Sequence, residues 1–425
     1  MSERTLSEWL SYLEGLHPSA IDMGLERSAQ VYERLGLTRP AAKVITVTGT
    51  NGKGSTCAFL AKMLSAQGLR VGMYNSPHLL RYNERVTIEG VQATDEQLCQ
   101  AFAAVEAARH DISLTYFEMG TLAAFWLFEQ AGLDAVALEV GLGGRLDAVN
   151  LVDADLALIT SIGIDHSDWL GSTRESVAFE KAGIMRHDTP CVCGDIDPPK
   201  PLLDKAHELS APLYVRAQHY DLKINSQSWS WEGLDANGKA VVITDIPLLT
   251  LPMANAALAL QAYALLDVPW QADVLKKALV DTHVVGRLDR RTVCVQGKQI
   301  DLLLDVGHNP QAAEFLAHQL KRLAPKNRIL TVFGLLSDKE LEGVITPLLP
   351  LVDKWCVTPL PTARSRSSGE LFDALNNLKA HVREASSVAE AINLQCQLAQ
   401  ENDLIVVFGS FYCVAEALEA LALPL

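Results

Sequence analysis

The chain has 425 residues, of which 49% are hydrophobic and 20% are charged, a balance typical of a folded protein whose length predicts two domains. The formal net charge of −15 argues against a nucleic acid or an acidic membrane surface as a partner. The sequence shows neither a secretory leader nor an apolar run of about 18 residues, so we expect a cytoplasmic protein without membrane contact.

The N-terminal part alternates strand-like apolar runs with helical ones, which predicts a parallel sheet with helices on both faces. The predicted strands cover 44–48, 70–75, 134–140 and 155–160. The predicted helices cover 26–35, 56–67, 94–109, 118–131 and 173–183. Residues 213–246, which contain the turn Asn237-Gly238, are expected to form antiparallel strands, and helices at 253–266 and 271–281 complete this part.

A second alternation follows Gly286-Arg287, and we place the domain boundary near 287–292, giving domains 1–289 and 290–425. Its predicted strands cover 300–306, 328–333, 353–357 and 404–408. Its predicted helices cover 311–323, 338–349, 368–378, 386–400 and 412–421. In such open sheets a ligand lies at the carboxyl ends of the strands.

The segment from Val44 to Ser55 predicts a phosphate-binding loop. A β-branched run leads into the glycine-rich turn Gly49-Thr50-Asn51-Gly52-Lys53-Gly54-Ser55, and a helical pattern follows. In this arrangement backbone N–H groups face the phosphates, Lys53 supplies a mobile positive charge and Ser55 can ligate Mg²⁺. The turn departs from the common P-loop pattern because Gly54 separates Lys53 from Ser55. The alternative is a glycine turn with a surface lysine, and we favour binding of a nucleoside triphosphate.

Polar residues that end predicted strands are the other candidates in the N-terminal part. Glu139 ends a buried run and is well placed to hold Mg²⁺, although a plain salt bridge is the alternative. Ser76 follows another strand and offers a hydroxyl. His166 ends a third strand, but a lone histidine is more often a packed side chain, and imidazole is an unusual Mg²⁺ ligand. Glu180-Lys181 lies on a helix, where a solvated charge pair is the usual explanation.

Two segments of the C-terminal part end strands and open helices in the same way. They are Asp305-Val306-Gly307-His308-Asn309-Pro310 and Phe408-Gly409-Ser410-Phe411-Tyr412. Either could be an ordinary helix start.

The order of these motifs resembles that of folylpolyglutamate synthases in the Mur-ligase superfamily, and most closely the bacterial bifunctional dihydrofolate synthase/folylpolyglutamate synthases. The likeness runs from about residue 9 to residue 421, with small departures at Ser55, where Thr is common, and Gly307, where Ala is common. It rests on segments 21–27, 49–55, 76–78, 115–118, 138–148, 165–166, 180–184, 286–287, 305–310 and 409–411.

The resemblance implies an α/β protein with an N-terminal P-loop ATPase-type doubly wound sheet domain, which includes a small antiparallel β part, and a C-terminal Rossmann-like α/β domain. It implies that Ser76, Glu139 and His166 are Mg²⁺ ligands and that Lys181 is a carbamylated lysine beside the metal. The implied ATP contacts are Gly49, Thr50, Asn51, Gly52, Lys53, Gly54, Ser55, Asn255, Arg287 and Asp305. The implied pterin-pocket residues are Asp22, Met23, Gly24, Leu25, Arg27, Thr115, Tyr116, Phe117, Glu118, Leu146, Asp147 and Ala148, and His308 and Ser410 are implied to hold glutamate.

The expected reaction joins L-glutamate to dihydropteroate or a tetrahydrofolate, with ATP and Mg²⁺, through an acyl phosphate. Lys53, Lys181, His166 and His308 are the residues expected to serve catalysis, and a monomer is expected. A peptidoglycan amino-acid ligase is the nearest alternative, but those proteins carry a sizeable domain before the ATP loop and only 48 residues precede Gly49. A nucleotide-switch binding protein is the alternative from another class.

Overall fold

The computed structural model describes residues 4–295, 297–323 and 328–423 of the chain. These residues form two compact units, Met1–Thr282 and His283–Leu425. The division falls a few residues before the boundary predicted from the sequence.

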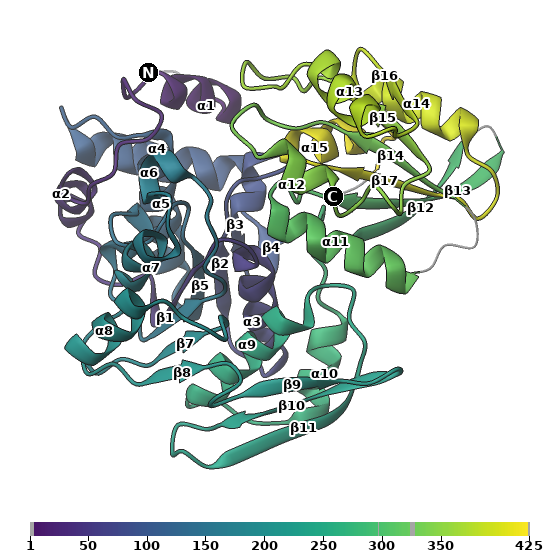
Figure 1. Ribbon diagram of the computed structural model, residues 1–425. Helices are drawn as coiled ribbons and strands as arrows, with labels where there is room; N and C mark the ends of the chain where they lie inside the picture. The colour runs from purple at the N-terminus through teal and green to yellow at the C-terminus, as the bar shows by residue number, and fades with distance from the viewer. Residues whose placement is uncertain (1–3, 296, 324–327, 424–425) are drawn as a thin grey trace. The chain divides into compact units, whose positions relative to one another are not determined.

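The main sheet of the first unit has the strand order β4-β3-β2-β5-β1-β6-β7-β8 (Figure 1). The strands are β1 (Ala41–Thr48), β2 (Val71–Tyr74), β3 (Val86–Ile88), β4 (Val91–Gln92), β5 (Leu133–Glu139), β6 (Leu156–Ile159), β7 (Cys191–Cys193) and β8 (Leu213–Val215). The strands from β2 to β8 in this order pair in parallel, and β3 and β4 add an antiparallel edge. The carboxyl ends of the parallel strands therefore lie along one edge of the sheet.

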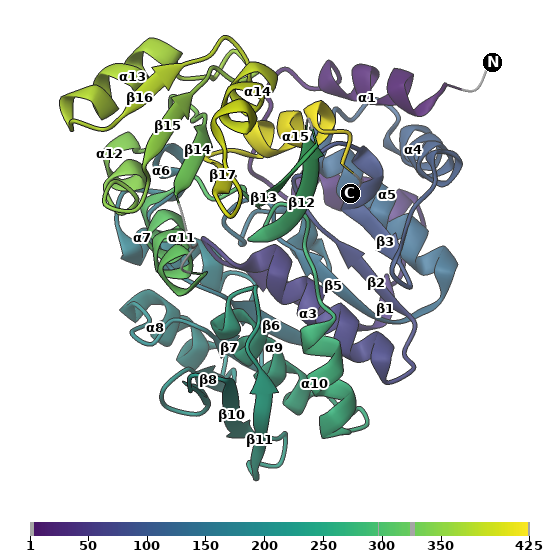
Figure 2. The same ribbon diagram turned by 90° about the vertical axis from the view of Figure 1, so that its right-hand side faces the viewer.

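Helices cover both faces of this sheet (Figure 2). One face carries α3 (Lys53–Ala66), α9 (Met253–Leu265) and α10 (Ala272–Val280). The other face buries the larger core, to which α1 (Leu6–Glu14), α2 (Glu26–Arg34), α4 (Asp95–Arg109), α5 (Tyr116–Ala131), α7 (Arg174–Ala182) and α8 (Lys200–Glu208) contribute. Successive residues of β1 point to opposite faces of the sheet. Val44 belongs to this larger core, and its neighbour Ile45, which does not, is also fully buried. Both faces of β1 are therefore covered.

A small antiparallel sheet follows, with the order β11-β10-β9, built from β9 (Asp221–Ile224), β10 (Ser228–Leu234) and β11 (Ala240–Pro247). The prediction that antiparallel strands begin at residue 213 is wrong. Residues 213–215 form β8, which pairs in parallel with β7, because the strand–helix alternation continues through α8.

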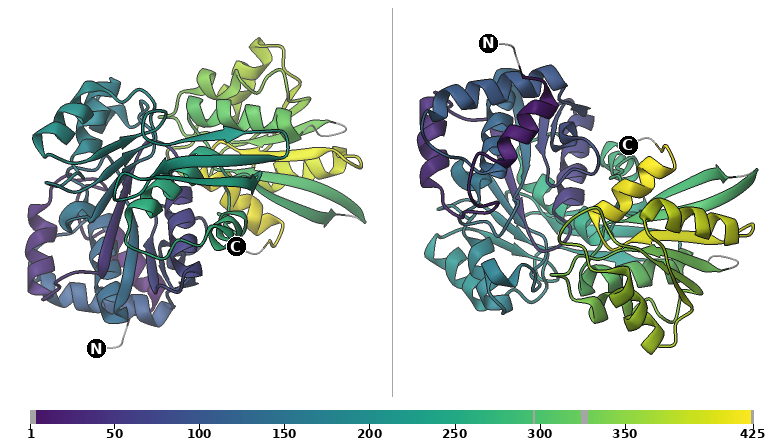
Figure 3. Two further views of the ribbon diagram at one scale, coloured as in Figure 1. Left: turned by 90° about the horizontal axis from the view of Figure 1, so that it is seen from below. Right: turned by 90° about the horizontal axis from the view of Figure 1, so that it is seen from above.

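The second unit is a sheet with the order β12-β13-β17-β14-β15-β16, flanked by helices on both sides (Figure 3). The strands are β12 (Asp289–Val295), β13 (Lys298–Asp305), β14 (Ile329–Phe333), β15 (Lys354–Val357), β16 (Val382–Glu384) and β17 (Leu404–Phe408). Among these described strands only the pair β12–β13 is antiparallel, and the other neighbouring strands pair in parallel. The helices are α11 (Pro310–Leu323), α12 (Leu341–Ile345), α13 (Ser368–Asn377), α14 (Val388–Leu398) and α15 (Phe411–Ala420).

The helix predicted over 338–349 is wrong in extent, because α12 covers only Leu341–Ile345. Pro347 and Pro350 lack the backbone N–H that a continuing helix needs, and the chain passes into turns at this point. The predicted strand 404–408 coincides with β17, and the other predicted strands and helices of this unit are present with one or both ends shifted.

Candidate active site

The glycine loop between β1 and α3 has a backbone that requires glycine. Gly49 has φ +152° and a Cβ there would lie 1.8 Å from Oγ1 of Thr160. Gly52 has φ +90° at the N-cap of α3, and a Cβ there would lie 2.7 Å from the side-chain amide of Asn255. The backbone N–H of Thr50 donates to the Ser161 carbonyl at 2.9 Å, which holds the loop against the end of β6. The loop is therefore a tight cradle at the start of a helix, where backbone N–H groups attract anions.

Lys53 and Ser55 occupy the positions that a phosphate-binding loop needs. The ammonium group of Lys53 donates to the carbonyls of Gly49 at 3.0 Å and Thr50 at 3.4 Å, so it lies over the loop. The Oγ of Ser55 donates to the Gly52 carbonyl at 3.1 Å and accepts from Nδ2 of Asn255 at 2.8 Å. The structure thus places Asn255, on α9, against the loop, and the ATP contact that the resemblance implies for it stays a prediction.

Glu139 ends β5 and is only 5% exposed. Its Oε2 accepts a hydrogen bond of 3.2 Å from the backbone N–H of Ser76, which follows β2. A Cβ on Gly54 would lie 3.4 Å from the same oxygen, so the carboxylate lies beside the start of α3. Two of the expected metal ligands, Ser76 and Glu139, are therefore adjacent.

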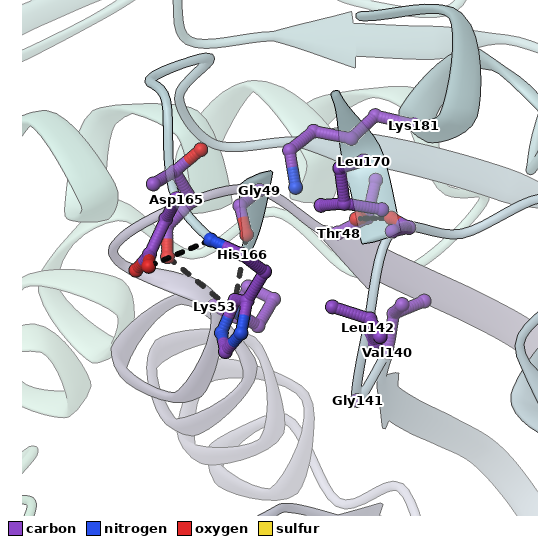
Figure 4. Close-up of a pocket in the computed structure, with 12 residues that line it drawn as sticks. Thr48, Gly49, Lys53, Val140, Gly141, Leu142, Asp165, His166, Leu170 and Lys181 are labelled. Atoms are coloured by element: carbon purple, nitrogen blue, oxygen red, sulfur yellow. Dashed lines mark hydrogen bonds between the residues drawn. The ribbon is translucent and has the colours of Figure 1, made fainter. Parts of the chain in front are cut away.

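A pocket opens beside the loop, and residues from several elements line it (Figure 4). Its walls include Gly49, Thr50, Lys53, Gly141, Asp165, His166 and Lys181. His166 begins the short helix α6 (Ser167–Leu170) with φ 52°, and its backbone N–H donates to Oδ1 of Asp165 at 2.8 Å. Lys181 extends from α7 toward Gly49 and the segment that carries Asp165.

The described residues contain no cluster of three or more His, Cys, Asp or Glu side chains that could hold a metal ion. Mg²⁺ usually keeps several waters and binds one or two carboxylates together with substrate phosphates. The single buried carboxylate of Glu139 beside the glycine loop is compatible with this mode of Mg²⁺ binding. The donors at the loop therefore suit Mg²⁺ better than a metal held entirely by protein.

The amino group of Lys181 is buried, with 2% of the residue exposed. Burial lowers the pKa of Lys181 to about 7; the positive charge of Lys53 lowers it further and Asp165 opposes the shift. A large fraction of this amine is therefore neutral near neutral pH. The solvated charge pair that the sequence alone favoured for Glu180-Lys181 is therefore wrong for Lys181, because its side chain is buried.

Phe117 and Asp147 lie together at the carboxyl end of β5. A Cβ on Gly141 would lie 2.7 Å from the Phe117 ring and 3.3 Å from Oδ2 of Asp147. Asp147 accepts from the backbone N–H groups of Leu142 at 2.8 Å and Val149 at 2.9 Å. Burial raises the pKa of Asp147 to about 6, and these hydrogen bonds oppose the rise.

The charged groups of the segment 21–27 contact one another and α5. Arg27 donates to Oδ2 of Asp22 at 2.7 Å and to Oε1 of Glu118 at 2.9 Å. Glu118 is buried and also accepts from the Ser28 hydroxyl and from the backbone N–H of Thr115, which caps α5. These side chains hold the segment in place, and a role of Asp22 or Arg27 in pterin binding stays a prediction.

The other residues expected at the pterin pocket lie near Phe117 and Asp147 or near the segment 21–27. The Cε of Met23 lies 3.9 Å from the position that a Cβ would take on Gly143, a residue of the pocket wall, while Gly24 and Leu25 precede α2. The ring of Tyr116 lies 5.7 Å from that of Tyr82, beneath the guanidinium of Arg85. Leu146 and Ala148 flank Asp147, and Ala148 is buried.

The candidates of the second unit gather at the carboxyl ends of β13 and β17. Asp305 is buried and accepts from the backbone N–H groups of Leu288 at 2.9 Å and Gly307 at 2.8 Å. Burial raises the pKa of Asp305, and the charge of Arg287 opposes the rise. The Arg287 guanidinium lies 5.2 Å above the ring of Phe411, and the His308 ring lies 6.3 Å from that ring.

Ser410 caps α15 by accepting from the backbone N–H of Tyr412 at 3.2 Å, so its helix-start role is real. Sequence reasoning did not single out Phe411, although its place directly after Ser410 was a signal. It also missed Thr160 and Ser161. Both hydroxyls donate to the carbonyl of Asn51 in the glycine loop, and the Ser161 hydroxyl also accepts from the Asn51 backbone N–H. Their position at the end of a predicted strand was the signal.

Comparison with known proteins agrees with this arrangement. Residues 47–193 match the Mur ligase middle domain, and residues 287–411 match the Mur ligase glutamate ligase domain. The dihydrofolate synthase/folylpolyglutamate synthase of Escherichia coli K12 is 42% identical over 416 residues, which cover 98% of this chain and 95% of that protein. The chain belongs to the dihydrofolate synthase/folylpolyglutamate synthase family.

Solved structures of this family share the fold. E. coli FolC in complex with DHPP and ADP has a TM-score of 0.92 at 42% identity and covers 99% of this chain and 98% of its own. The bifunctional enzyme of Yersinia pestis complexed with AMPPNP and a Mn ion has a TM-score of 0.91 at 44% identity and covers 99% of this chain and 98% of its own. The predictions of family, fold class and ATP-dependent ligase chemistry are confirmed. Within the described residues no helix is long and apolar enough to cross a membrane.

Proposed function

We propose that this chain uses ATP to join L-glutamate to dihydropteroate and to tetrahydrofolates through an acyl phosphate. The single observation that carries the proposal is the glycine loop with Lys53, beside a pocket that Lys181 enters. A structure of a relative 44% identical to this chain contains Mn, AMPPNP and L-glutamate, which supports ATP, a Mg²⁺-type cation and glutamate as ligands here. We further propose a cytoplasmic monomer.

The chemical difficulty is that a carboxylate is a poor electrophile. Transfer of the γ-phosphoryl group of ATP to the pterin carboxylate makes an acyl phosphate, and the glutamate amine then displaces phosphate to form the amide. The protein contributes positioning and charge neutralisation. Exclusion of water preserves the acyl phosphate until the amine arrives.

The loop Gly49–Ser55 would bind the phosphates through backbone N–H groups. The ammonium of Lys53, which lies on the carbonyls of Gly49 and Thr50, needs only to turn from them to meet a phosphate oxygen. Asn255 would orient Ser55, since the two side chains are hydrogen-bonded at 2.8 Å.

Ser76, Glu139 and His166 are the residues proposed to hold the divalent cation. The cation supplies positive charge to the phosphates and orients them. Glu139 is suited to this role because the Ser76 N–H fixes one of its oxygens.

Lys181 is proposed to act as a carbamate. Carbamylation joins a neutral amine to carbon dioxide and releases a proton, which leaves an anionic oxygen group. The buried amine has a pKa of about 7 and therefore supplies the neutral form at neutral pH. This gives a physical reason for a lysine in such a pocket.

Phe117, Asp147 and the segment 21–27 are proposed to bind the pterin, with Met23 and Leu25 flanking the flat ring. Thr115, Tyr116, Glu118, Leu146 and Ala148 complete the proposed walls. In the second unit we propose that Arg287 and Asp305 contact ATP, and that His308 and Ser410 hold the incoming glutamate.

An oxygen-transfer experiment tests the acyl phosphate. Dihydropteroate labelled with oxygen-18 in its carboxylate is incubated with the purified chain, ATP, Mg²⁺ and glutamate. The proposal expects one labelled oxygen per turnover in the released phosphate, because the carboxylate oxygen leaves with phosphorus. Unlabelled phosphate formed alongside the amide product would contradict it.

A further inference from the structure

Asn150 joins the end of α7 to the turn that follows β5. It is buried, at 6% exposure, in the short helix η2 (Ala148–Leu151). Its Nδ2 donates to the Arg145 carbonyl at 3.1 Å and to the Gly183 carbonyl at 3.0 Å. Gly183 is the C-cap residue of α7, so one amide group links that helix end to the turn.

The orientation of this amide is determined by its partners. Oδ1 of Asn150 accepts from a guanidinium N–H of Arg186 at 3.0 Å, and the same guanidinium nitrogen donates to the Asn150 carbonyl at 3.0 Å. The reversed amide would place an oxygen against two carbonyls and an N–H₂ group against a cation. Both polar atoms of the side chain are therefore engaged, and the junction has one arrangement.

The parts that meet at this junction are closely packed. The backbone N–H of Arg145 donates to the Glu180 carbonyl at 2.8 Å. A Cβ on Gly144 would lie 3.4 Å from Cα of Lys181, and a Cβ on Gly183 would lie 2.6 Å from Cα of Arg145. A shift of α7 relative to the turn would therefore move the backbone of Lys181.

Two pocket residues depend on the same short segment. Lys181 lies in the last turn of α7 and its side chain lines the pocket. Asp147 caps the start of η2 and accepts a hydrogen bond from the backbone N–H of Leu142, which also lines the pocket. The segment from Asp147 to Asn150 thus links the wall after β5 to the helix that carries Lys181.

We propose that Asn150 is a positioning residue for the ligase reaction, which acts by holding Lys181 at its place in the pocket. This inference rests on the function proposed above. Asn150 does not line the pocket, so its effect passes through the helix end rather than through contact with a substrate.

The variant Asn150→Asp removes the two donated hydrogen bonds while keeping the shape of the side chain. An aspartate places an oxygen against the carbonyls of Arg145 and Gly183, which repel it and lose their donors. Misplacement of a reacting group by about 1 Å can cost about a hundredfold in rate. We therefore expect kcat to fall by between about tenfold and a hundredfold, with KM for ATP changed by less than about threefold.

Gln395 offers a matched control in the second unit. It is fully buried, its Nε2 donates to the carbonyls of Thr331 at 2.7 Å and Lys354 at 3.3 Å, and its Oε1 accepts from Arg383 at 3.1 Å. Gln395→Glu therefore removes the same kind of bonds at a residue to which no catalytic or binding role is assigned. We expect Gln395→Glu to lower the melting temperature about as much as Asn150→Asp but to leave kcat of the folded protein near that of the wild type.

Arg186→Met is the second variant, because it keeps Asn150 but removes the guanidinium that orients it; we expect a smaller fall in kcat. A double-mutant cycle tests the route of the effect. The residual rate of the Lys181→Ala variant is followed by the release of radiolabelled phosphate. In that variant, the addition of Asn150→Asp should change kcat by less than about twofold.

The outcomes are distinguishable. Absence of ligation by the wild-type chain would overturn the proposed function itself. Ligation by the wild type, together with equal kcat values for Asn150→Asp and Gln395→Glu, would overturn only the positioning role. A full additional loss in the Lys181→Ala background would overturn the claim that Asn150 acts through Lys181.

Discussion

The backbone N–H of Ser76 donates a hydrogen bond of 3.2 Å to Oε2 of Glu139. This bond links the carboxyl ends of β2 and β5, which are neighbours in the sheet. The carboxylate also faces Gly54 at the start of α3. One oxygen of Glu139 is therefore anchored beside the glycine loop, which is the kind of support that a proposed metal ligand needs.

Loss of either Lys53 or Glu139 should impair phosphoryl transfer. We expect Lys53→Ala and Glu139→Ala each to lower kcat/KM by about a hundredfold or more, equivalent to about 2.7 kcal/mol of transition-state stabilisation. Steady-state kinetics on folded variants measures this. Lys200→Ala, which breaks an exposed pair with Asp204, is the control and should be neutral. Near-normal turnover of either loop-side variant would refute its assigned role.

Gly52 and Gly238 form a matched pair for testing the loop geometry. Gly52 has φ +90° and a Cβ there would clash with Asn255, whereas Gly238 has φ +75° and open space around a Cβ. Alanine at either position should cost about 1 kcal/mol of stability through the backbone. Only Gly52→Ala should also weaken ATP binding, by about tenfold or more, because the clash lies in the cradle. Equal ATP affinity in the two variants would argue against this cradle as the phosphate site.

Asp22→Ala should separate the two pterin substrates. Asp22 pairs with Arg27 at 2.7 Å, so its removal loosens the segment 21–27. We expect use of dihydropteroate to weaken more than use of a tetrahydrofolate, because the longer folate has further contacts along its tail, while constants for ATP and glutamate change little. Initial rates with each substrate decide the matter. An equal loss with both would mean that the segment has a structural or shared role.

The buried amine of Lys181 predicts a pH dependence of stability. Its pKa is about 7 in the folded chain, against an ordinary 10.5 in the unfolded chain. Between these values the unfolded chain binds a proton that the folded chain lacks, so the free energy of unfolding rises with pH, by about 1.4 kcal/mol per pH unit from this group. Below pH 7 the amine is protonated in both the folded and the unfolded chain, and the folded chain bears the full free-energy cost of burying that charge.

Lys181→Met removes this titration. Denaturant unfolding in carbon dioxide-free buffer between pH 7 and pH 9.5 should therefore show a shallower rise for the variant than for the wild type. Parallel profiles would show that the amine does not titrate in this window.

The sequence predicted the parts of the fold that local patterns determine. The alternation of β-branched runs with helical periodicity identified β1, β5, β6 and the helices between them. It did not identify short edge strands such as β3 and β4, because two or three residues carry too little periodicity. It misplaced residues 213–215, since the partner that makes β8 parallel lies at 191–193.

The candidate site was predictable where it follows from strand ends. Glu139, Ser76 and the glycine loop were found because the carboxyl ends of parallel strands meet at one edge. The sequence indicated no role for Asn150, and it placed Phe411 in a motif without a role, because their contacts with Gly183 and Arg287 are made across the fold. Arg27 and Glu118 contact each other 91 positions apart, a relationship that no local pattern encodes. The ligand-binding roles of individual residues stay predictions.

The central claim, ATP-dependent ligation of a pterin acid to glutamate, is tested most directly by measuring ADP release. The purified chain is given ATP and Mg²⁺ with dihydropteroate, with tetrahydrofolate, with glutamate, and with each pterin together with glutamate. We expect ADP release only when a pterin acid and glutamate are both present, with one amide formed per ADP. ADP release at full rate from ATP alone, or with no amide product, would contradict it.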